Sequence, residues 1–300
     1  MKNQVKADVT IGVHPNNHSL FVLRRKGFLE SLLAEHNENV EWVDYLEGAK
    51  TPERIASGQI DVGGTGSTPP LMAQANDIDI VYLGTSNGRP ASGALVVRTD
   101  STIKSLQELK GKRITFTQGS WHTSFLATAL DKAGLKYEDV IHVEAEHGGQ
   151  ALLEEQAEAW IANDPQLSEL ENKGLVRVLV PLDEFISHRS VWFTSRQFAT
   201  KKPQTFKKVI QALQKTDEWI QANPREAAQL FAKDLPDWPS VDTWESALRR
   251  RPWGVQPITK EFIEEQQRTA DLLARQNLLP KAIIVDDAVL ESYQQVIGGN

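Results

Sequence analysis

The stretch "QIDVGGTGSTPPLMAQA", residues 59–75, joins a strand, a glycine-rich turn and a helix start without a spacer. Its apolar beginning predicts a short strand. Thr68-Pro69 predicts a helix start, because proline is favoured at the first helical position. The glycines between them allow a tight turn and let another group approach the backbone closely. The first N–H groups of a helix lack partners within the helix and carry the positive end of its dipole, so this joint is suited to an anion.

Familiar phosphate-binding motifs do not fit this joint. From Gly64 the pattern is Gly-x-Gly-x-x-Pro, and it follows the third predicted strand instead of the first, so it is not a dinucleotide fingerprint. No Gly-Lys-Ser/Thr follows, which excludes a P-loop. The run Gly64-Thr65-Gly66-Ser67 also fails the Gly-x-Ser-x-Gly pattern of a hydrolase nucleophile. We therefore expect no catalytic residues. Two interpretations of this joint remain: a binding site for an anion, or a turn followed by a capped helix without a ligand.

Strand-like and helix-like segments alternate on both sides of this joint. The first 85 residues have the order β-α-β-α-β-α-β, and the same alternation resumes over residues 93–195. This order predicts mostly parallel sheets covered by helices. The predicted N-caps are Ser19, Thr51, Ser120 and Asp164. From Pro203 onward the predicted helices lie at residues 205–222, 223–235, 240–250, 258–276 and 286–297.

Two short crossovers join the α/β units, near residues 85–93 and 186–193, and no glycine-, serine- or proline-rich linker separates them. A double crossover fits a discontinuous first lobe with a second lobe inserted into it and a cleft between the two. The sequence therefore predicts an α/β fold with a helical C-terminal tail. Its lobe 1 is expected at residues 1–90 and 193–300, and its lobe 2 at residues 91–192.

The composition excludes several kinds of site. The 300-residue chain has a formal net charge of -7 and no cysteine, so it has no disulfide, thiolate metal site or cysteine nucleophile. The acidic balance argues against nucleic acid as a partner, and the clusters Arg24–Lys26 and Arg249–Arg251 are interpreted as solvated helix faces. His14 and His18 flank a proline in a loop and do not form a helical zinc pair. We expect them either at the surface or bonded to a ligand oxygen, with no metal and no cofactor.

Membrane and targeting signals are missing from the sequence itself. No apolar run approaches the ~20 residues that cross a bilayer. The beginning, "MKNQVKADVTIGV", has no apolar signal-peptide region. Either the protein is cytoplasmic, or the chain begins after a removed leader.

Three further polar joints follow predicted strands: "PNNHS" at residues 15–19, "QGSWHTS" at residues 118–124 and "ANDP" at residues 162–165. The carboxyl ends of parallel strands share one edge of a sheet, and ligands bind there. Four helix starts rich in hydroxyls and amides, on facing edges, predict an anion-binding cleft. Arg89 and Arg189 lie at the crossovers. Each is expected either to hold a sulfonate or sulfate bidentately or to form an ion pair between lobes.

The chain resembles the periplasmic substrate-binding proteins of ABC importers for aliphatic sulfonates and taurine. The matching runs include "VTIGV", "ASGQIDVGGTGSTPPLMAQA", "IVYLGTSNG", "GALVVRTDSTIKSLQELKGKRITFTQGSWHTSFLATALDKAGLKYEDV" and "AEAWIANDPQLSELE", and the similarity covers nearly the whole chain. The resemblance implies a two-lobed type II periplasmic binding fold, or Venus flytrap. It also implies a small anionic organosulfur ligand, a membrane ABC permease as partner and a periplasmic location after loss of the leader. We expect a monomer.

The resemblance further implies which residues contact the ligand. Position by position, these are Asn17, Gly66, Ser67, Thr68, Gly119, Ser120, Trp121, Trp160, Asn163, Asp164, His188 and Arg189. Their place in the same joints adds Asn16, His18, Asn87 and His122 as candidates. Ser67 stands where the family usually has an acidic residue, and the loss of that charge favours an anion or a ligand without an amine.

Two alternatives stay open. One is a binding protein for another small ligand, a thiamine-pyrimidine precursor or nitrate. The other is an enzyme on the same fold, similar to the thiamine-pyrimidine synthesis proteins. Those proteins use a cysteine-rich motif and a lysine-bound pyridoxal cofactor, so the lack of cysteine argues against the enzyme.

Overall fold

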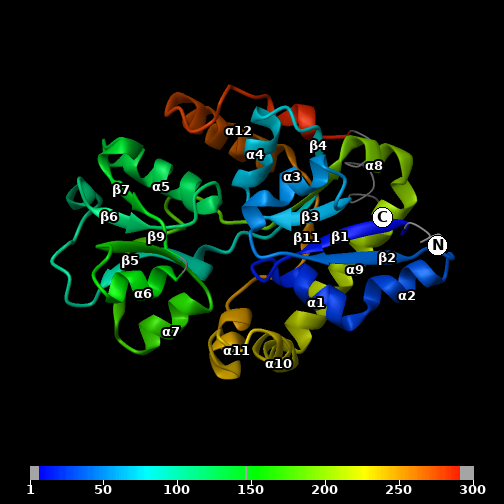
Figure 1. Ribbon diagram of the computed structural model, residues 1–300, viewed down its shortest axis with the longest axis horizontal. Helices are drawn as coiled ribbons and strands as arrows, with labels where there is room; N and C mark the ends of the chain where they lie inside the picture. The colour runs from blue at the N-terminus through cyan, green and yellow to red at the C-terminus, as the bar shows by residue number, and fades with distance from the viewer. Residues whose placement is uncertain (1–6, 146, 291–300) are drawn as a thin grey trace, which may run out of the picture.

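Two β-sheets organise the chain, one in each of two lobes (Figure 1). The computed structural model describes residues 7–145 and 147–290. The lobe 1 sheet has the order β11-β4-β10-β3-β1-β2, with β1 (Val9–Val13), β2 (Val40–Asp44), β3 (Val62–Thr65), β4 (Ile80–Ser86), β10 (Val191–Ser195) and β11 (Val255–Gln256). The lobe 2 sheet has the order β7-β6-β8-β5-β9, with β5 (Gly93–Arg98), β6 (Arg113–Thr115), β7 (Ile141–Val143), β8 (Ala159–Asn163) and β9 (Val176–Pro181).

Both sheets are mixed, although the sequence predicted mostly parallel ones. In lobe 1, β1 is parallel to β2 and β3, but β10 runs antiparallel between β3 and β4, and β11 is antiparallel to β4. In lobe 2, β6 is parallel to β7 and β8, whereas β5 is antiparallel to β8 and β9. The chain leaves lobe 1 at the end of β4 and returns beside that end, where Val191 pairs with Thr85. The returning strand must therefore run back against its neighbours.

Helices cover both faces of each sheet (Figure 1). On one face of the lobe 1 sheet lie α1 (His18–Lys26), α2 (Phe28–Ala34), α9 (Pro203–Ala222), α10 (Pro224–Asp234) and α11 (Val241–Arg249). On its other face lie α3 (Thr51–Ala56), α4 (Thr68–Ala75) and α12 (Lys260–Arg275). The lobe 2 sheet has α5 (Trp121–Lys132) on one face and α6 (Gly148–Leu153) and α7 (Gln166–Asn172) on the other. The short α8 (Arg196–Lys201) follows β10. None of the described helices combines the length and apolar character that a bilayer crossing requires.

Several helix starts differ from the prediction. Ser120 caps α5 as expected, because its hydroxyl accepts a hydrogen bond from the His122 N–H. The cap of α1 is Asn17 and not Ser19, since the Asn17 side chain accepts from the N–H of Leu20. Ser19 instead donates to buried Asp217, which is 198 positions away in the sequence, so a tertiary contact takes its hydroxyl.

Two other caps were wrong, and one predicted helix is only partly described. Thr51 is the first residue of α3 and donates to the carbonyl oxygen of Gly48. Asp164 precedes Pro165, the residue at the cap of α7, and accepts hydrogen bonds from Ser168. Of the helix predicted at residues 286–297, the described part contains a short 3-10 turn, Val285–Ala288, and residues 291–297 lie outside the described residues.

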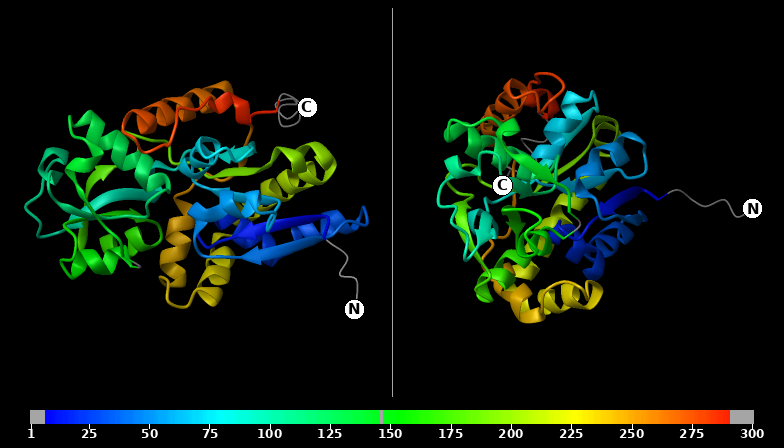
Figure 2. Two further views of the ribbon diagram at one scale, coloured as in Figure 1. Left: turned by 45° about the horizontal axis from the view of Figure 1, so that its top comes forward. Right: turned by 60° about the vertical axis from the view of Figure 1, so that its left-hand side comes forward.

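The C-terminal tail connects the two lobes on opposite sides. α12 packs against α5 of lobe 2, and α11 contacts α7 of the same lobe. Figures 1 and 2 show α12 along one side of the junction between the lobes and α11 on the other side. The tail therefore holds lobe 1 and lobe 2 together at both edges of the space between them.

Candidate anion-binding cavity

A small polar cavity lies between the lobes, at the carboxyl ends of the strands of lobe 1. Its volume is about 60 Å³. By the guide of about 15 Å³ for a water molecule, it has room for about four waters or one small oxyanion group. Ligands of open α/β sheets bind at this edge. The lining residues are His14, Asn16, His18, Thr65, Gly66, Arg89, Ser92, Trp121, Asn163, Asp164, His188, Ser190 and Arg251.

Two buried arginines give the cavity its positive charge. Arg89 is 6% exposed and comes from the crossover between β4 and β5, whereas Arg251 is 8% exposed and comes from the loop after α11. Arg89 Nε donates to the carbonyl oxygen of His188 at 3.2 Å, and an Arg251 Nη donates to His18 Nδ1. Arg251 Nε has no hydrogen-bond partner among the described residues. Burial lowers the pKa of Arg251 to about 10, and burial together with Arg251 lowers the pKa of Arg89. Both guanidiniums stay charged at neutral pH, so a bound anion would offset the cost of burying them.

The histidines around the arginines are neutral. Burial lowers the pKa of His14 to about 4, and it lowers the pKa values of His18 and His188 well below the ordinary value, with help from the neighbouring guanidiniums. Because His18 Nδ1 accepts from Arg251, its ring carries no proton on that atom. The imidazoles therefore serve as hydrogen-bonding groups, and the positive charge of the cavity belongs to the arginines.

A chain of hydrogen bonds sets the orientation of the Asn163 amide. The backbone N–H of Thr117 donates to His122 Nδ1 at 2.9 Å, so the ring proton of neutral His122 lies on Nε2. That atom is 3.2 Å from Asn163 Oδ1 and donates to it. Burial lowers the pKa of His122 to about 4, which keeps this tautomer at neutral pH. With its oxygen occupied, Asn163 has its NH₂ group left for the cavity, as a further donor for an anion.

Two buried carboxylates lie near the arginines, and each has hydrogen-bond partners of its own. Asp217 accepts hydrogen bonds from Ser19 and from the N–H of Gly254, and burial raises its pKa to about 6. Asp164 lines the cavity, but one oxygen accepts from Ser168 and the other forms an ion pair with Arg250. Both carboxylates nevertheless raise the pKa of Arg251 against the effect of burial, so they offset part of the positive charge that the arginine pair presents.

The structure brings seven of the sixteen predicted site residues into this cavity. These seven are Asn16, His18, Gly66, Trp121, Asn163, Asp164 and His188. The nine that do not line it are Asn17, Ser67, Thr68, Asn87, Gly119, Ser120, His122, Trp160 and Arg189.

Each of these nine residues makes a contact elsewhere in the structure. Asn17 and Ser120 cap helices, and His122 orients Asn163 from behind. The Asn87 amide donates to the carbonyl oxygen of Trp253, and Arg189 donates to the carbonyl oxygen of Ser86 beside Glu265. The hydroxyl of Thr68 is hydrogen-bonded to that of Ser124, and the Ser67 carbonyl oxygen accepts a hydrogen bond from the Gln266 side chain. The Gly119 N–H donates to the Thr123 hydroxyl. The Trp160 ring packs on Gly148 and Gly149.

Sequence reasoning missed Arg251, and of the two positions that it left open for His14 the structure rules out the exposed one. Arg249–Arg251 was interpreted as a solvated helix face, but α11 ends at Arg249 and Arg251 turns inward. His14 is 4% exposed, and its Nε2 lies 2.7 Å from the Gly64 carbonyl oxygen, whereas a surface position was one of two expectations. The Pro252 that follows Arg251 was the one local signal that the helix face ends there.

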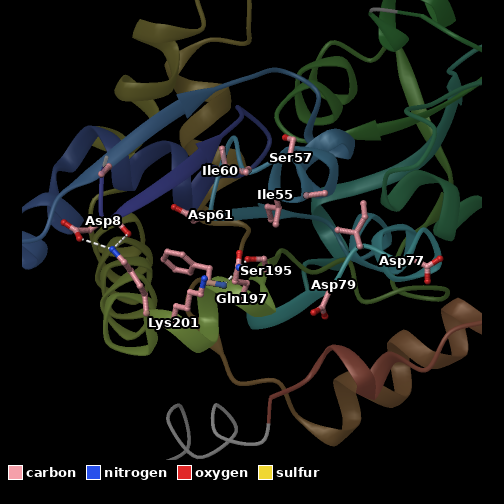
Figure 3. Close-up of a pocket in the computed structure, with 16 residues that line it drawn as sticks. Asp8, Ile55, Ser57, Ile60, Asp61, Asp77, Asp79, Ser195, Gln197 and Lys201 are labelled. Carbon is pink, nitrogen blue, oxygen red and sulfur yellow. Dashed lines mark hydrogen bonds and ion pairs between the residues drawn. The ribbon is translucent and has the colours of Figure 1, made fainter. Parts of the chain in front are cut away.

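A larger hollow of about 790 Å³ lies at the opposite end of lobe 1 (Figure 3). Asp8, Asp61 and Asp79 immediately precede β1, β3 and β4, so the hollow is at the amino ends of these strands. Two lysines line it, Lys201 and Lys202, and Lys202 is paired with Asp8 at 2.9 Å. The acidic lining argues against an anion site there. So does its position, because ligands of open α/β sheets bind at the carboxyl ends of the strands and this hollow lies at their amino ends. No group of three or more acidic or histidine side chains within residues 7–145 and 147–290 is arranged to hold a metal ion.

The fold and the cavity define a two-lobed binding protein of the periplasmic type. The family described as NMT1/THI5 like matches residues 15–227, and the chain belongs to that family. The alkanesulfonate-binding protein SsuA from Xanthomonas axonopodis pv. citri, in a structure bound to MOPS, is 30% identical with a TM-score of 0.84, covering 94% of this chain and 97% of that one. The periplasmic aliphatic sulphonate binding protein SsuA from Escherichia coli is 28% identical with a TM-score of 0.85, covering 94% and 92%. The taurine-binding periplasmic protein of Escherichia coli (strain K12) is 26% identical over 289 residues, covering 88% of this chain and 83% of the relative.

Proposed function

We propose that this protein is the substrate-binding component of an ABC importer and captures a small organosulfur anion: an aliphatic sulfonate, a taurine-like compound or a sulfate ester. The observation that carries the proposal is the pair of buried guanidiniums, Arg89 and Arg251, in the cavity between the lobes. A planar guanidinium matches the oxygens of a sulfonate bidentately. The printed names of the relatives, which are binding proteins for sulfonates and taurine, support the same class of ligand.

The proposed mechanism is closure of the lobes on the ligand. Arg251 and His18 would hold the anion from lobe 1, whereas Asn163 would hold it from lobe 2. A ligand that contacts both lobes binds the closed state better than the open one, and that difference in affinity shifts the population toward closure. The closed form would then be the one that a membrane permease recognises.

The proposed function requires two lobes, and we propose residue boundaries for them. Lobe 1 would comprise residues 1–90 and 193–300, and lobe 2 residues 91–192. The sheets support this division, with the refinement that β10, which begins at Val191, pairs with β3 and β4 of lobe 1. We also propose a monomer located in the periplasm that acts without catalysis. The names of the relatives support the location and the binding role.

Isothermal titration calorimetry with the purified chain tests the proposed function. The panel consists of isethionate, taurine, ethyl sulfate, inorganic sulfate, nitrate and an aminopyrimidine. We expect saturable binding of at least one of the first three. Binding confined to nitrate or the aminopyrimidine would replace the organosulfur class with the corresponding alternative ligand. Binding of inorganic sulfate alone would also contradict the proposal.

A further inference from the structure

We infer that the ligand is a compact sulfonate or sulfate ester with a short polar tail, and not a long-chain or ring-bearing sulfonate. This inference rests on the proposed function and narrows it. Three features carry it: the position of Trp121, the bonds that hold the lobes together on both sides of the cavity, and the polar character of the one exposed edge.

Trp121 forms one wall of the cavity, at the start of α5 in lobe 2. A methyl group placed on Gly66 would lie 3.1 Å from Trp121 Cβ, and one placed on Gly93 would lie 2.8 Å from Trp121 Cη2. The indole therefore reaches from the β3–α4 joint of lobe 1 to the first residue of β5 in lobe 2. His188 packs on it with the ring centroids 4.1 Å apart. A side chain on Gly93 would collide with the indole and one on Gly66 would be tight, so the Trp121 side chain fills the space between these two backbone segments.

Bonds between the lobes close both sides of the cavity. On the side of α12, the hydroxyls of Thr68 and Ser124 are hydrogen-bonded, and Gln276 Nε2 lies 3.4 Å from an Asp131 carboxylate oxygen. On the side of α11, Arg250 pairs with the buried Asp164. A tail longer than the cavity could pass on either side only by opening one of these contacts.

The part of the cavity lining that reaches solvent is polar. Among the lining residues, Asn16 is the exposed one, and Gly66 and Asn163 are half-buried. A hydroxyl or amine on a short tail would find amide partners at this edge. A long apolar tail would instead extend into water and gain no burial, because apolar surface contributes to affinity only when it leaves water. By the same guide of about 15 Å³ for each water molecule, the cavity of about 60 Å³ has room for about four water-sized groups, and a sulfonate head alone already contains one sulfur and three oxygens.

A chain-length series measured by calorimetry tests this inference. The probes are methanesulfonate, isethionate, butanesulfonate, octanesulfonate and MOPS, all with the unmodified protein. We expect the tightest binding for methanesulfonate or isethionate, and about tenfold weaker binding for octanesulfonate and MOPS, the loss expected when one hydrogen bond between the lobes must open. Equal or tighter binding of the long or ring-bearing probes would overturn the inference and leave the proposed function standing. Failure of every sulfonate and of ethyl sulfate would contradict the proposed function itself.

A variant tests whether the Trp121 indole, and not the size of the ligand in general, limits the length of the ligand tail. Trp121→Ala removes the indole, so the affinity for butanesulfonate and octanesulfonate should rise relative to isethionate. Trp219→Phe, a tryptophan change on α9 in the lobe 1 helices, is the matched control and should leave the order of affinities unchanged. Should Trp121→Ala fail to fold, Trp121→Leu provides a smaller truncation, and the series with the unmodified protein decides by itself. An unchanged order in a folded Trp121 variant would show that the indole does not limit the tail.

Discussion

Arg251→Met should have opposite effects on stability and on binding. In the ligand-free protein, Arg251 is a buried charge whose pKa falls from 12.5 to about 10 because of burial. The charged form is therefore disfavoured in the folded state at every pH below about 10. The difference corresponds to about 3 kcal/mol at neutral pH, because one pKa unit is about 1.4 kcal/mol.

Three terms set the size of the change in stability. Removal of the charge relieves about 3 kcal/mol. Against this, loss of the contact with the Trp253 ring, whose centroid lies 4.8 Å from the guanidinium carbon, costs about 1 kcal/mol, and loss of the hydrogen bond to the buried His18 Nδ1 costs about 1 kcal/mol more. We therefore expect the free energy of unfolding without ligand to rise by about 1 kcal/mol, because the relieved cost of the buried charge exceeds the two lost contacts. Binding of isethionate should weaken by about 1.5–3 kcal/mol, the value of a charge-assisted hydrogen bond, which corresponds to about 10- to 150-fold.

Urea unfolding without ligand and calorimetry with isethionate measure the two effects on the same samples. The matched control is Arg249→Met, two positions earlier, where an exposed arginine pairs with Glu245 on the surface of α11. Its effects should stay within about 0.5 kcal/mol in both assays. If Arg251→Met lowered the free energy of unfolding and left the affinity for isethionate unchanged, Arg251 would be a structural residue and the reasoning would be refuted.

Three further predictions follow from the hydrogen bonds and ion pairs around the cavity. Asn163→Asp replaces the NH₂ donor by a carboxylate oxygen and should weaken isethionate binding by about tenfold or more in calorimetry, and an unchanged Kd would contradict its proposed role. Because the His122 pKa is lowered from 6.5 to about 4, the folded state disfavours its cation. Lowering the pH from 6.5 to 5 should therefore cost about 1.5 kcal/mol of unfolding free energy from this residue, partly offset by Asp217, whose raised pKa of about 6 acts in the opposite direction. Urea unfolding at both pH values measures this cost. The fall in the free energy of unfolding should be smaller in His122→Gln than in the unmodified protein, and an equal fall would contradict the prediction. Arg250→Ala leaves the buried Asp164 carboxylate without its cation and should lower the free energy of unfolding by about 3 kcal/mol, whereas a change below about 0.5 kcal/mol would show that the pair is not needed.

Most of the fold could be predicted because it depends on local patterns. The alternation of strand-like and helix-like segments indicated two α/β units, and short crossovers indicated that one lobe is inserted into the other. Short-range signals also placed the start of α5 at Ser120, whose hydroxyl caps the helix two residues on. The antiparallel β10 was missed because strand direction depends on where the chain re-enters the sheet, and no local pattern records that.

The sequence by itself determined which segments end strands and begin helices, and so which polar joints face the space between the lobes. Tertiary structure alone decided which side chains reach that space. Arg251 is hydrogen-bonded to His18, which is 233 positions away in the sequence. Ser120 was correctly predicted at a helix start, but its hydroxyl donates a hydrogen bond to the Thr117 carbonyl oxygen of its own loop. The reason is physical: backbone conformation follows from neighbouring residues, whereas burial, charge state and hydrogen-bond partners follow from the distant segments that fold against a group. An arginine that looked like part of a solvated basic cluster thus became a buried cation beside neutral histidines.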